Sequence, residues 1–218
     1  MNDPQAPIRA VLFDLGGVLL DIDFGRALAA WERHTRLPAP EMRALFSFDE
    51  AFRRHETGHL DDDAYFAYLR ERLELDCGLD AVRAGFDAIL LGEIGETVDL
   101  LQALRGRVPR YAISNTNPSH VAQMERVFPG FLQRFDAVFT SHRIGHRKPQ
   151  PEAFAHVLEA IGVPARETLL FDDLPANVDA ARALGLQAVQ VRGPRDVRAA
   201  LAAAGLLSAR APAAAPRS

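Results

Sequence analysis

Short apolar runs that end in a polar residue alternate with segments of helical periodicity along most of this chain. Such alternation is typical of a parallel β-sheet covered by helices, in which ligands bind beyond the carboxyl ends of the strands. The sequence therefore predicts an α/β fold with a ligand site at one edge of its sheet. The predicted strands are residues 10–13, 110–113, 135–140, 168–171 and 187–191, and the predicted helices between them lie near 96–106, 118–127, 150–161, 175–184 and 195–204.

The stretch from Phe24 to Glu93 differs, because it has helical periodicity and no convincing strand. We interpret residues 24–93 as an all-helical cap inserted after the first strand, and residues 1–23 and 94–207 as the sheet-containing core. The tail, 208–218, is rich in Ala, Pro and Arg and is predicted to be disordered. The candidate helices of the cap lie near 24–35, 40–54, 61–74 and 79–91.

The amino-acid composition limits which classes of partner the protein is expected to bind. The net charge of −4 is spread over scattered Arg, Asp and Glu, without a basic stripe, so we expect a small-molecule ligand and no nucleic acid. Cys77 is the only cysteine, which fits a reducing compartment. No stretch approaches the roughly 20 apolar residues of a membrane span. We therefore expect a cytoplasmic protein with no membrane partner; nothing in the pattern specifies an oligomeric state.

Acidic residues and glycines follow two of the predicted strands. Asp14 comes directly after the first strand and is followed by Gly16 and Gly17, so its carboxylate stands on a tight turn whose backbone can approach a ligand. Asp172 and Asp173 follow another strand, and two adjacent carboxylates there are costly unless a cation or solvent screens them. Asp14 is therefore a candidate to approach a ligand, and Asp172-Asp173 a candidate to face a cation or solvent. A carboxylate that merely caps the next turn remains the alternative for Asp14.

Groups that could bind an anion come from two further segments. Ser114 and Asn115 follow a strand and offer a hydroxyl, an amide and backbone N–H groups to phosphate oxygens. Of the 25 basic side chains 24 are arginines, and Lys148 is the one lysine. A lysine ammonium is a compact point charge that can approach a single oxygen closely, which the planar arginine fork cannot do. Chance survival on a solvated loop is the alternative for Lys148.

Together these motifs, in this order on this strand pattern, resemble the haloacid dehalogenase-like superfamily of phosphohydrolases over residues 8–193. The residues of the four motifs are most similar to those of the small sugar-phosphate phosphatases typified by bacterial α-D-glucose-1-phosphate phosphatase. These motifs are Phe-Asp-Leu-Gly-Gly-Val, Ser-Asn-Thr-Asn, Arg-Lys-Pro and Phe-Asp-Asp. The amino-terminal phosphatase domain of soluble epoxide hydrolase is similar too. The resemblance implies a Rossmann-like core with a helical cap.

It also implies a chemistry, in which the enzyme hydrolyses a small phosphorylated metabolite, expected to be a sugar phosphate. Asp14 would be the nucleophile, forming an aspartyl-phosphate that water then hydrolyses. Ser114 and Asn115 would bind phosphoryl oxygens. Lys148 would act with them and neutralise charge on the nucleophile and the phosphoryl group.

The cofactor implied by the resemblance is Mg²⁺. It would be held by the Asp14 carboxylate, the backbone carbonyl of Gly16 and the Asp173 carboxylate. Asp172 and Asn177 would orient these ligands or replace one of them.

One position departs from the family pattern. Most phosphatases of this superfamily carry a second Asp two residues after the nucleophile, as the acid that protonates the leaving group, and this chain has Gly16 there. General acid help is typically worth about 10²–10⁴-fold in rate. Candidate replacements by location are Asp21, Asp23, His55 and His59, with solvated histidines as the alternative for the last two. Candidate specificity residues of the cap are Phe46, Phe48, Phe52, Arg53 and His55.

Two other functions stay open on the sequence. A 2-haloacid dehalogenase also lacks the second Asp, but Gly16 and the Asp172-Asp173 pair argue against it. A non-catalytic protein that binds a phosphorylated ligand is the other, although binding alone does not require a nucleophile at Asp14.

Overall fold

The structure, a computed structural model, describes residues 6–207. The predicted disorder of residues 208–218 concerns residues outside that range. All five predicted strands are present and form one parallel sheet in the order β5-β4-β1-β6-β7, which confirms the α/β prediction. The strands are β1 Ala10–Phe13, β4 Arg110–Ser114, β5 Ala137–Thr140, β6 Thr168–Asp172 and β7 Gln187–Gln190.

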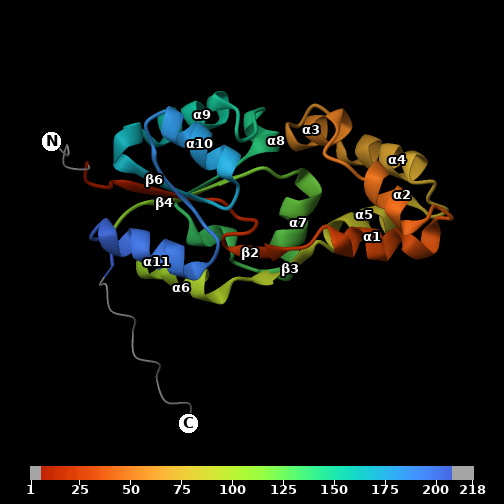
Figure 1. Ribbon diagram of the computed structural model, residues 1–218, viewed down its shortest axis with the longest axis horizontal. Coiled ribbons are helices and arrows are strands. Elements are labelled where there is room, and N and C mark those ends of the chain that lie inside the picture. Colours follow the sequence, from red (N-terminus) through yellow and green to blue (C-terminus); the bar gives the residue numbers. More distant parts are fainter. Residues whose placement is uncertain (1–5, 208–218) are drawn as a thin grey trace, which may run out of the picture.

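Helices cover both faces of this sheet (Figure 1). Side chains alternate between the faces along each strand, so Val11 and Phe13 of β1 pack on one side while Leu12 packs on the other. One face is covered by α6 Gly95–Ala103, α7 Pro118–Val127 and α11 Pro194–Ala203, and the other by α9 Pro151–Ile161 and α10 Pro175–Ala183. Short α8 Ser141–Ile144 follows β5, and 3₁₀ turns lie at Glu32–His34, Leu132–Arg134 and Ala165–Glu167.

A group of helices between the first strands and β4 has a hydrophobic core of its own. Trp31, Phe66 and Phe86 are fully buried in it, and it is separate from the two clusters that flank the sheet. In Figure 1 these helices form a lobe at one end of the molecule. They are α1 Gly25–Trp31, α2 Ala39–Leu45, α3 Glu50–Glu56, α4 Asp62–Arg72 and α5 Leu79–Asp87.

The prediction of one helix near residues 40–54 is wrong, because two helices, α2 and α3, lie there with a break between them. Asp49 is the reason: its carboxylate accepts a hydrogen bond of 3.0 Å from the backbone N–H of Phe52 and so caps a new helix. The apolar spacing continues across the break, and periodicity alone does not reveal the cap.

The prediction that residues 24–93 contain no strand is also wrong. Strand β3, Leu90–Glu93, pairs in antiparallel orientation with β2, Leu20–Ile22, and the two form a separate ribbon. The pairing joins segments about seventy residues apart, and a segment as short as Leu-Leu-Gly-Glu after a helix carries no local sign of it. The division of the chain into core and cap otherwise stays a prediction.

No helix within residues 6–207 is both long enough and apolar enough to cross a bilayer.

Candidate active site

The sheet brings the predicted site residues together at the carboxyl ends of three adjacent strands. Strand β1 lies between β4 and β6, with Phe13 paired to Ala112 on one side and to Phe171 on the other. The backbone N–H of Asp14 then donates a 2.8 Å hydrogen bond to the carbonyl of Phe171. Residues 14, 114 and 172 therefore share one edge of the sheet, as parallel strands of this order require.

Three carboxylates cluster at this edge. Asp14, Asp172 and Asp173 each offer an oxygen within 4.8 Å of the others. Burial raises the pKa of Asp14 to about 7, the nearby Lys148 ammonium opposes that shift, and the Asp172 carboxylate adds to it. A cluster of oxygen donors with this mutual repulsion fits a hard divalent cation such as Mg²⁺.

Lys148 is the cation among these carboxylates. Its side chain is 1% exposed, and its Nζ lies 2.9 Å from Oδ2 of Asp14 and 2.6 Å from Oδ2 of Asp172. Burial by itself would lower the pKa of Lys148, but the carboxylates of Asp14 and Asp172 outweigh it and raise that pKa. The ammonium is therefore held in its charged form, in direct contact with the expected nucleophile.

The two adjacent aspartates have different surroundings. Both oxygens of buried Asp172 are engaged: Oδ2 accepts from Lys148 Nζ, while Oδ1 accepts 2.9 and 3.0 Å hydrogen bonds from Asn177 Nδ2 and the backbone N–H of Leu174. Asp173 is half-buried, and burial followed by the neighbouring Asp172 charge raises its pKa. Asp173 is thus the carboxylate of this pair that stays available to a ligand.

Gly17 makes room for Asp173. Its φ of +72° is a backbone conformation that residues with a side chain rarely adopt. A Cβ at that position would also lie 2.5 Å from Oδ2 of Asp173. The second glycine after Asp14 is therefore required for both its turn and its close approach to the carboxylate cluster.

Asn115 bonds to the backbone on both sides of Lys148. Its Oδ1 accepts a 2.8 Å hydrogen bond from the Lys148 N–H, and its Nδ2 donates a 2.8 Å bond to the Lys148 carbonyl. This contact was not anticipated from the sequence, which assigns Asn115 to phosphate. The amide side chain therefore holds the lysine in place, and buried Ser114 at the end of β4 lies beside it.

A cavity of about 60 Å³ lies between this edge and the helical lobe. Gly16, Ser114 and Asn115 line it from the sheet side. Its other lining residues are mostly apolar, and among the helical lobe they include Phe24, Phe52 and Glu56. The site is thus closed over by α3 and the start of α1.

Of the residues proposed to replace the missing acid, none lines that cavity. Asp23 accepts a 2.7 Å hydrogen bond from the Gly25 N–H at the start of α1, and Asp21 is exposed on β2. His55 is fully buried in the helical lobe, where it bonds to Asp62 at 2.7 Å. His59 is exposed in the turn after α3, so the two histidines do not share a helix face.

Of the predicted specificity residues only Phe52 lines the cavity. Phe46 packs against Trp31 inside the lobe, Phe48 is exposed, and exposed Arg53 pairs with Glu50. The apolar or basic character of these side chains does not by itself show which way each one points. The break between α2 and α3 interrupts the helical periodicity from which a direction could be predicted.

Three side chains near the site were not predicted from the sequence: Glu56, Arg147 and His120. Glu56 is a buried acid at the end of α3, and Oε2 of its carboxylate accepts a 2.8 Å bond from Arg147 Nε. His120 lines the cavity, stacks on Phe86 at 4.3 Å, and burial lowers its pKa to about 4. Two signals for these residues were available in the sequence. One was the basic residue directly before Lys148, and the other was the acid beside the buried face of α3.

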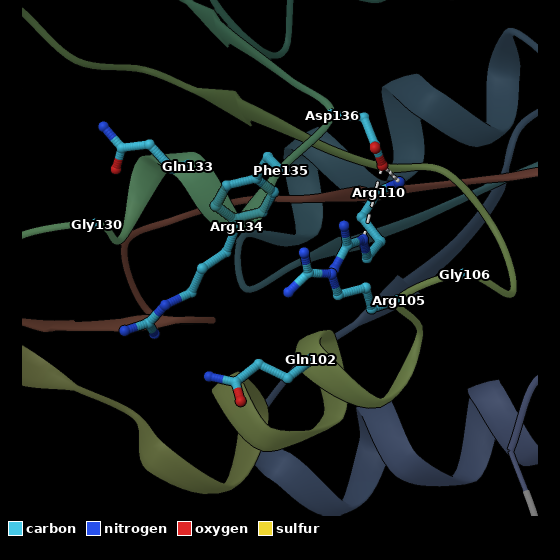
Figure 2. Close-up of a pocket in the computed structure, with 9 residues that line it drawn as sticks. All are labelled: Gln102, Arg105, Gly106, Arg110, Gly130, Gln133, Arg134, Phe135 and Asp136. Atoms are coloured by element: carbon cyan, nitrogen blue, oxygen red, sulfur yellow. Dashed lines mark hydrogen bonds and ion pairs between the residues drawn. The ribbon is translucent and has the colours of Figure 1, made fainter.

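A larger groove on the described surface lies elsewhere. It has a volume of about 840 Å³ and is lined by arginines that include Arg105, Arg110 and Arg134 (Figure 2). Arg110 begins β4 whereas Ser114 ends it, so the groove is at the opposite edge of the sheet from the carboxylates. Arg134 is neutralised by a 2.6 Å pair with Glu93. Size therefore does not identify the site here; the carboxylate cluster does.

Comparison with known proteins agrees with this geometry. The family model for haloacid dehalogenase-like hydrolases matches residues 8–185. The chain is 29% identical over 200 residues to D-ribitol-5-phosphate phosphatase of Bacteroides thetaiotaomicron, covering 88% of this chain and 95% of that one. It is 30% identical over 193 residues to phosphatase MT3486 of Mycobacterium tuberculosis, covering 84% and 87%.

Solved structures are similar as well. A HAD family enzyme of Bacteroides thetaiotaomicron, crystallised with magnesium and inorganic phosphate, superimposes with a TM-score of 0.76 at 25% identity, covering 85% of this chain and 95% of that one. The L-2-haloacid dehalogenase RSc1362 superimposes with a TM-score of 0.65 at 24% identity, covering 86% and 87%, which is a likeness of fold. By its motifs, its sheet and the family model that spans most of it, the chain belongs to the haloacid dehalogenase-like hydrolases.

Proposed function

We propose that the protein is a Mg²⁺-dependent phosphomonoesterase that hydrolyses a small phosphorylated metabolite, with a sugar phosphate as the expected class. The observation that carries the proposal is the buried Lys148 ammonium, bonded to Asp14 and Asp172 beside a third carboxylate. Relatives named as phosphatases, one of them for a sugar-alcohol phosphate, support the same activity.

The chemistry starts at Asp14. An oxygen of its carboxylate attacks phosphorus, the new O–P bond forms as the bond to the leaving oxygen breaks, and the aspartyl-phosphate results. Water then attacks the same phosphorus and releases phosphate, which restores the Asp14 carboxylate. Lys148 reduces the repulsion between the nucleophile and the anionic phosphoryl group, and Asp172 with Asn115 holds the lysine there.

The residues present fit the cofactor. Asp14 and Asp173, with the backbone carbonyl of Gly16, would hold Mg²⁺, and Asp172 and Asn177 would orient these ligands from behind. When bound, Mg²⁺ supplies a Lewis acid that draws charge from the phosphoryl oxygens. Ser114 would donate its hydroxyl to a phosphoryl oxygen, and Lys148 would contact another.

The leaving group receives no proton from position 16. A Cβ on Gly16 would lie 2.8 Å from Cδ1 of Ile22, so β2 occupies the space next to this glycine. The leaving group would therefore take its proton from water, from a hydroxyl of the substrate or from another side chain of the site. Sugar and polyol phosphates carry such hydroxyls.

A phosphate-release screen tests the proposal. Sugar phosphates and nucleotides are incubated with the protein and Mg²⁺, with EDTA in place of Mg²⁺, and with the Asp14→Asn variant. Turnover is expected with Mg²⁺ alone and to be lost in both other arms. Turnover that survives EDTA and the substitution contradicts the proposal, and chloride release from 2-chloropropionate in its place indicates a dehalogenase.

We also propose a cytoplasmic location and a substrate that is a free small molecule. The net charge of −4 and the single free cysteine support this. The small cavity above the carboxylate cluster supports a small leaving group. Fractionation of the cells that make the protein tests its location.

A further inference from the structure

An ion pair joins the helical lobe to the loop that carries the catalytic lysine. Glu56 ends α3, Arg147 directly precedes Lys148, and their atoms Oε2 and Nε lie 2.8 Å apart across 91 residues of chain. Figure 1 shows α3 next to α8, the helix that leads into this loop. The pair is therefore a direct link between the lobe above the site and the site itself.

The carboxylate of this pair is buried, whereas the guanidinium of Arg147 is only partly so. The side chains are 7% and 23% exposed for Glu56 and Arg147. Burial raises the pKa of Glu56, and the charges of Arg147 and Lys148 oppose that shift. A buried carboxylate that loses its cation is strongly destabilised, whereas an exposed pair contributes little. Separation of α3 from the loop therefore leaves an uncompensated charge on Glu56 or requires water to reach it.

The loop transmits the position of Arg147 to the reacting groups. The backbone of Lys148, one peptide further on, is bonded at its N–H and its carbonyl to Asn115. The N–H of Arg147 donates a 2.9 Å bond to the side chain of Gln150, which stiffens the same turn. These hydrogen bonds restrict the movement of the Arg147 guanidinium relative to the Lys148 ammonium.

The two elements also meet without a gap. Gly58, just after α3, has a φ of +74°, and a Cβ there would overlap the carbonyl oxygen of His142 in α8. Such an approach is possible for glycine alone. The turn after α3 therefore seats against α8 in one arrangement, and that arrangement places Glu56 over Arg147.

We propose that Glu56 is a positioning residue: its ion pair with Arg147 holds the helical lobe closed over the phosphate site and holds the Lys148 loop in its reactive position. The kinetic part of this inference rests on the phosphatase function proposed above. Glu56 also lines the cavity to which Gly16 and Ser114 contribute, so the ion pair lies at the border of that cavity.

Steady-state kinetics of four variants test the role. Glu56→Gln and Arg147→Gln each remove the ion pair, the double variant Glu56→Arg/Arg147→Glu restores it with the charges exchanged, and Glu50→Gln is the control. Glu50 lies on the same helix and pairs with Arg53 on the exposed surface. The substrate is the phosphomonoester turned over fastest in the release screen.

Each single variant at the pair is expected to lower kcat/KM by about 10–100-fold, and the exchanged pair to recover most of that loss. Glu50→Gln is expected to match the unaltered protein. An exchanged pair no better than the single variants overturns the proposal, because Glu56 would then act on the substrate without Arg147. A Glu56→Gln variant with unchanged kinetics overturns it as well.

Hydrogen exchange tests closure without relying on catalysis. In Glu56→Gln, the backbone amides of residues 50–60 and of residues 141–150 are both expected to exchange faster, by about 10-fold or more, because both segments lose the same contact. Glu50→Gln is expected to leave exchange in both segments unchanged. Unchanged exchange in Glu56→Gln overturns the proposal even if the protein proves to be an active phosphatase, and faster exchange in an inactive protein leaves closure standing while the phosphatase proposal fails.

Discussion

At the scale of single residues, Lys148 shows why one amine is retained in a chain that uses arginine elsewhere. Its Nζ lies between Asp14 and Asp172, at 2.9 and 2.6 Å, within a fully buried setting. A guanidinium is wider than an ammonium and carries its charge over a plane. The space that accepts one compact charge between two carboxylates therefore selects lysine.

Lys148→Arg is accordingly expected to lower kcat by about 100-fold or more although the net charge is unchanged, because the wider group displaces either a carboxylate or the phosphoryl group. Initial-rate kinetics of phosphate release measure this. The reverse exchange at an exposed position, Arg143→Lys in α8, is the control and is expected to be neutral. Near-normal turnover in Lys148→Arg would mean that this position accepts any cation.

Substitution of Gly17 is expected to impair activity as much as substitution of a charged residue of the site. Gly17→Ala places a Cβ against Asp173 and strains a φ of +72°, so it should move the carboxylate that we propose as a metal ligand. We expect the Mg²⁺ concentration for half-maximal activity to rise by about 10-fold or more, which corresponds to about 1.4 kcal/mol of binding free energy. Gly78→Ala, where φ is −72° and nothing lies within 4 Å, is the control. Equal Mg²⁺ requirements in the two variants would contradict the assignment of Asp173.

At the scale of elements, α5 and α7 are joined by a buried neutral histidine. His120 of α7 bonds through Nε2 to the carbonyl of Phe86 at 3.1 Å, with the Asp87 carboxylate 4.0 Å away. Burial lowers the pKa of His120 to about 4, and the carbonyl of Phe86 opposes that shift. The contact therefore favours the neutral ring.

The sign of the resulting pH dependence is set by that lowered pKa. The unfolded chain takes up a proton near pH 6.5, whereas the folded protein does so only near pH 4, so stability is complete above pH 6.5 and is lost as the pH falls toward 4. The loss should reach about 2 kcal/mol by pH 5. Urea unfolding at pH 7 and pH 5 measures it, and His120→Gln should reduce the difference between the two. A difference of the same size in His120→Gln would mean that other groups cause it.

At the scale of the whole molecule, the metal site proposed at the carboxylate cluster would link metal binding to folding. Asp14, Asp172 and Asp173 approach one another only in the folded protein, where their oxygens lie within 4.8 Å. A ligand that binds the folded state alone stabilises it, by about 2.7 kcal/mol when its concentration is 100 times its dissociation constant. If these carboxylates hold Mg²⁺ as proposed, folding creates the metal site, and metal is expected to stabilise the folded protein in turn.

Addition of Mg²⁺ to the EDTA-treated protein is thus expected to raise its Tm by several degrees. Asp173→Asn should abolish that rise, because it removes a charged ligand while keeping the shape of the side chain. Asp179→Asn, at an exposed position of α10, is the matched control and should leave the rise intact. If Mg²⁺ does not change the Tm of the unaltered protein, no metal is bound at this cluster.

The parallel sheet could be predicted because its signal is local. Each of its strands is a short apolar run, and four of them end at Asp or Ser. What the sequence concealed depends on contacts between distant segments. The ribbon of β2 and β3 pairs Leu20 with Glu93, and the hydrogen bonds of Asn115 to Lys148 span 33 residues. Neither pairing leaves a period or a spacing that could be read from either segment alone.

By itself, the sequence determined the α/β class, the helical segment after the first strand and the set of polar residues at the strand ends, because periodicity and strand-end chemistry are properties of short segments. Only the tertiary structure decided what those residues do to one another. It separated Asp172, bonded to Lys148, from Asp173, which remains free, and it moved the two candidate histidines of α3 and its following turn away from the cavity. It also placed Glu56 over Arg147, since the mutual position of distant side chains is fixed by packing and not by spacing along the chain.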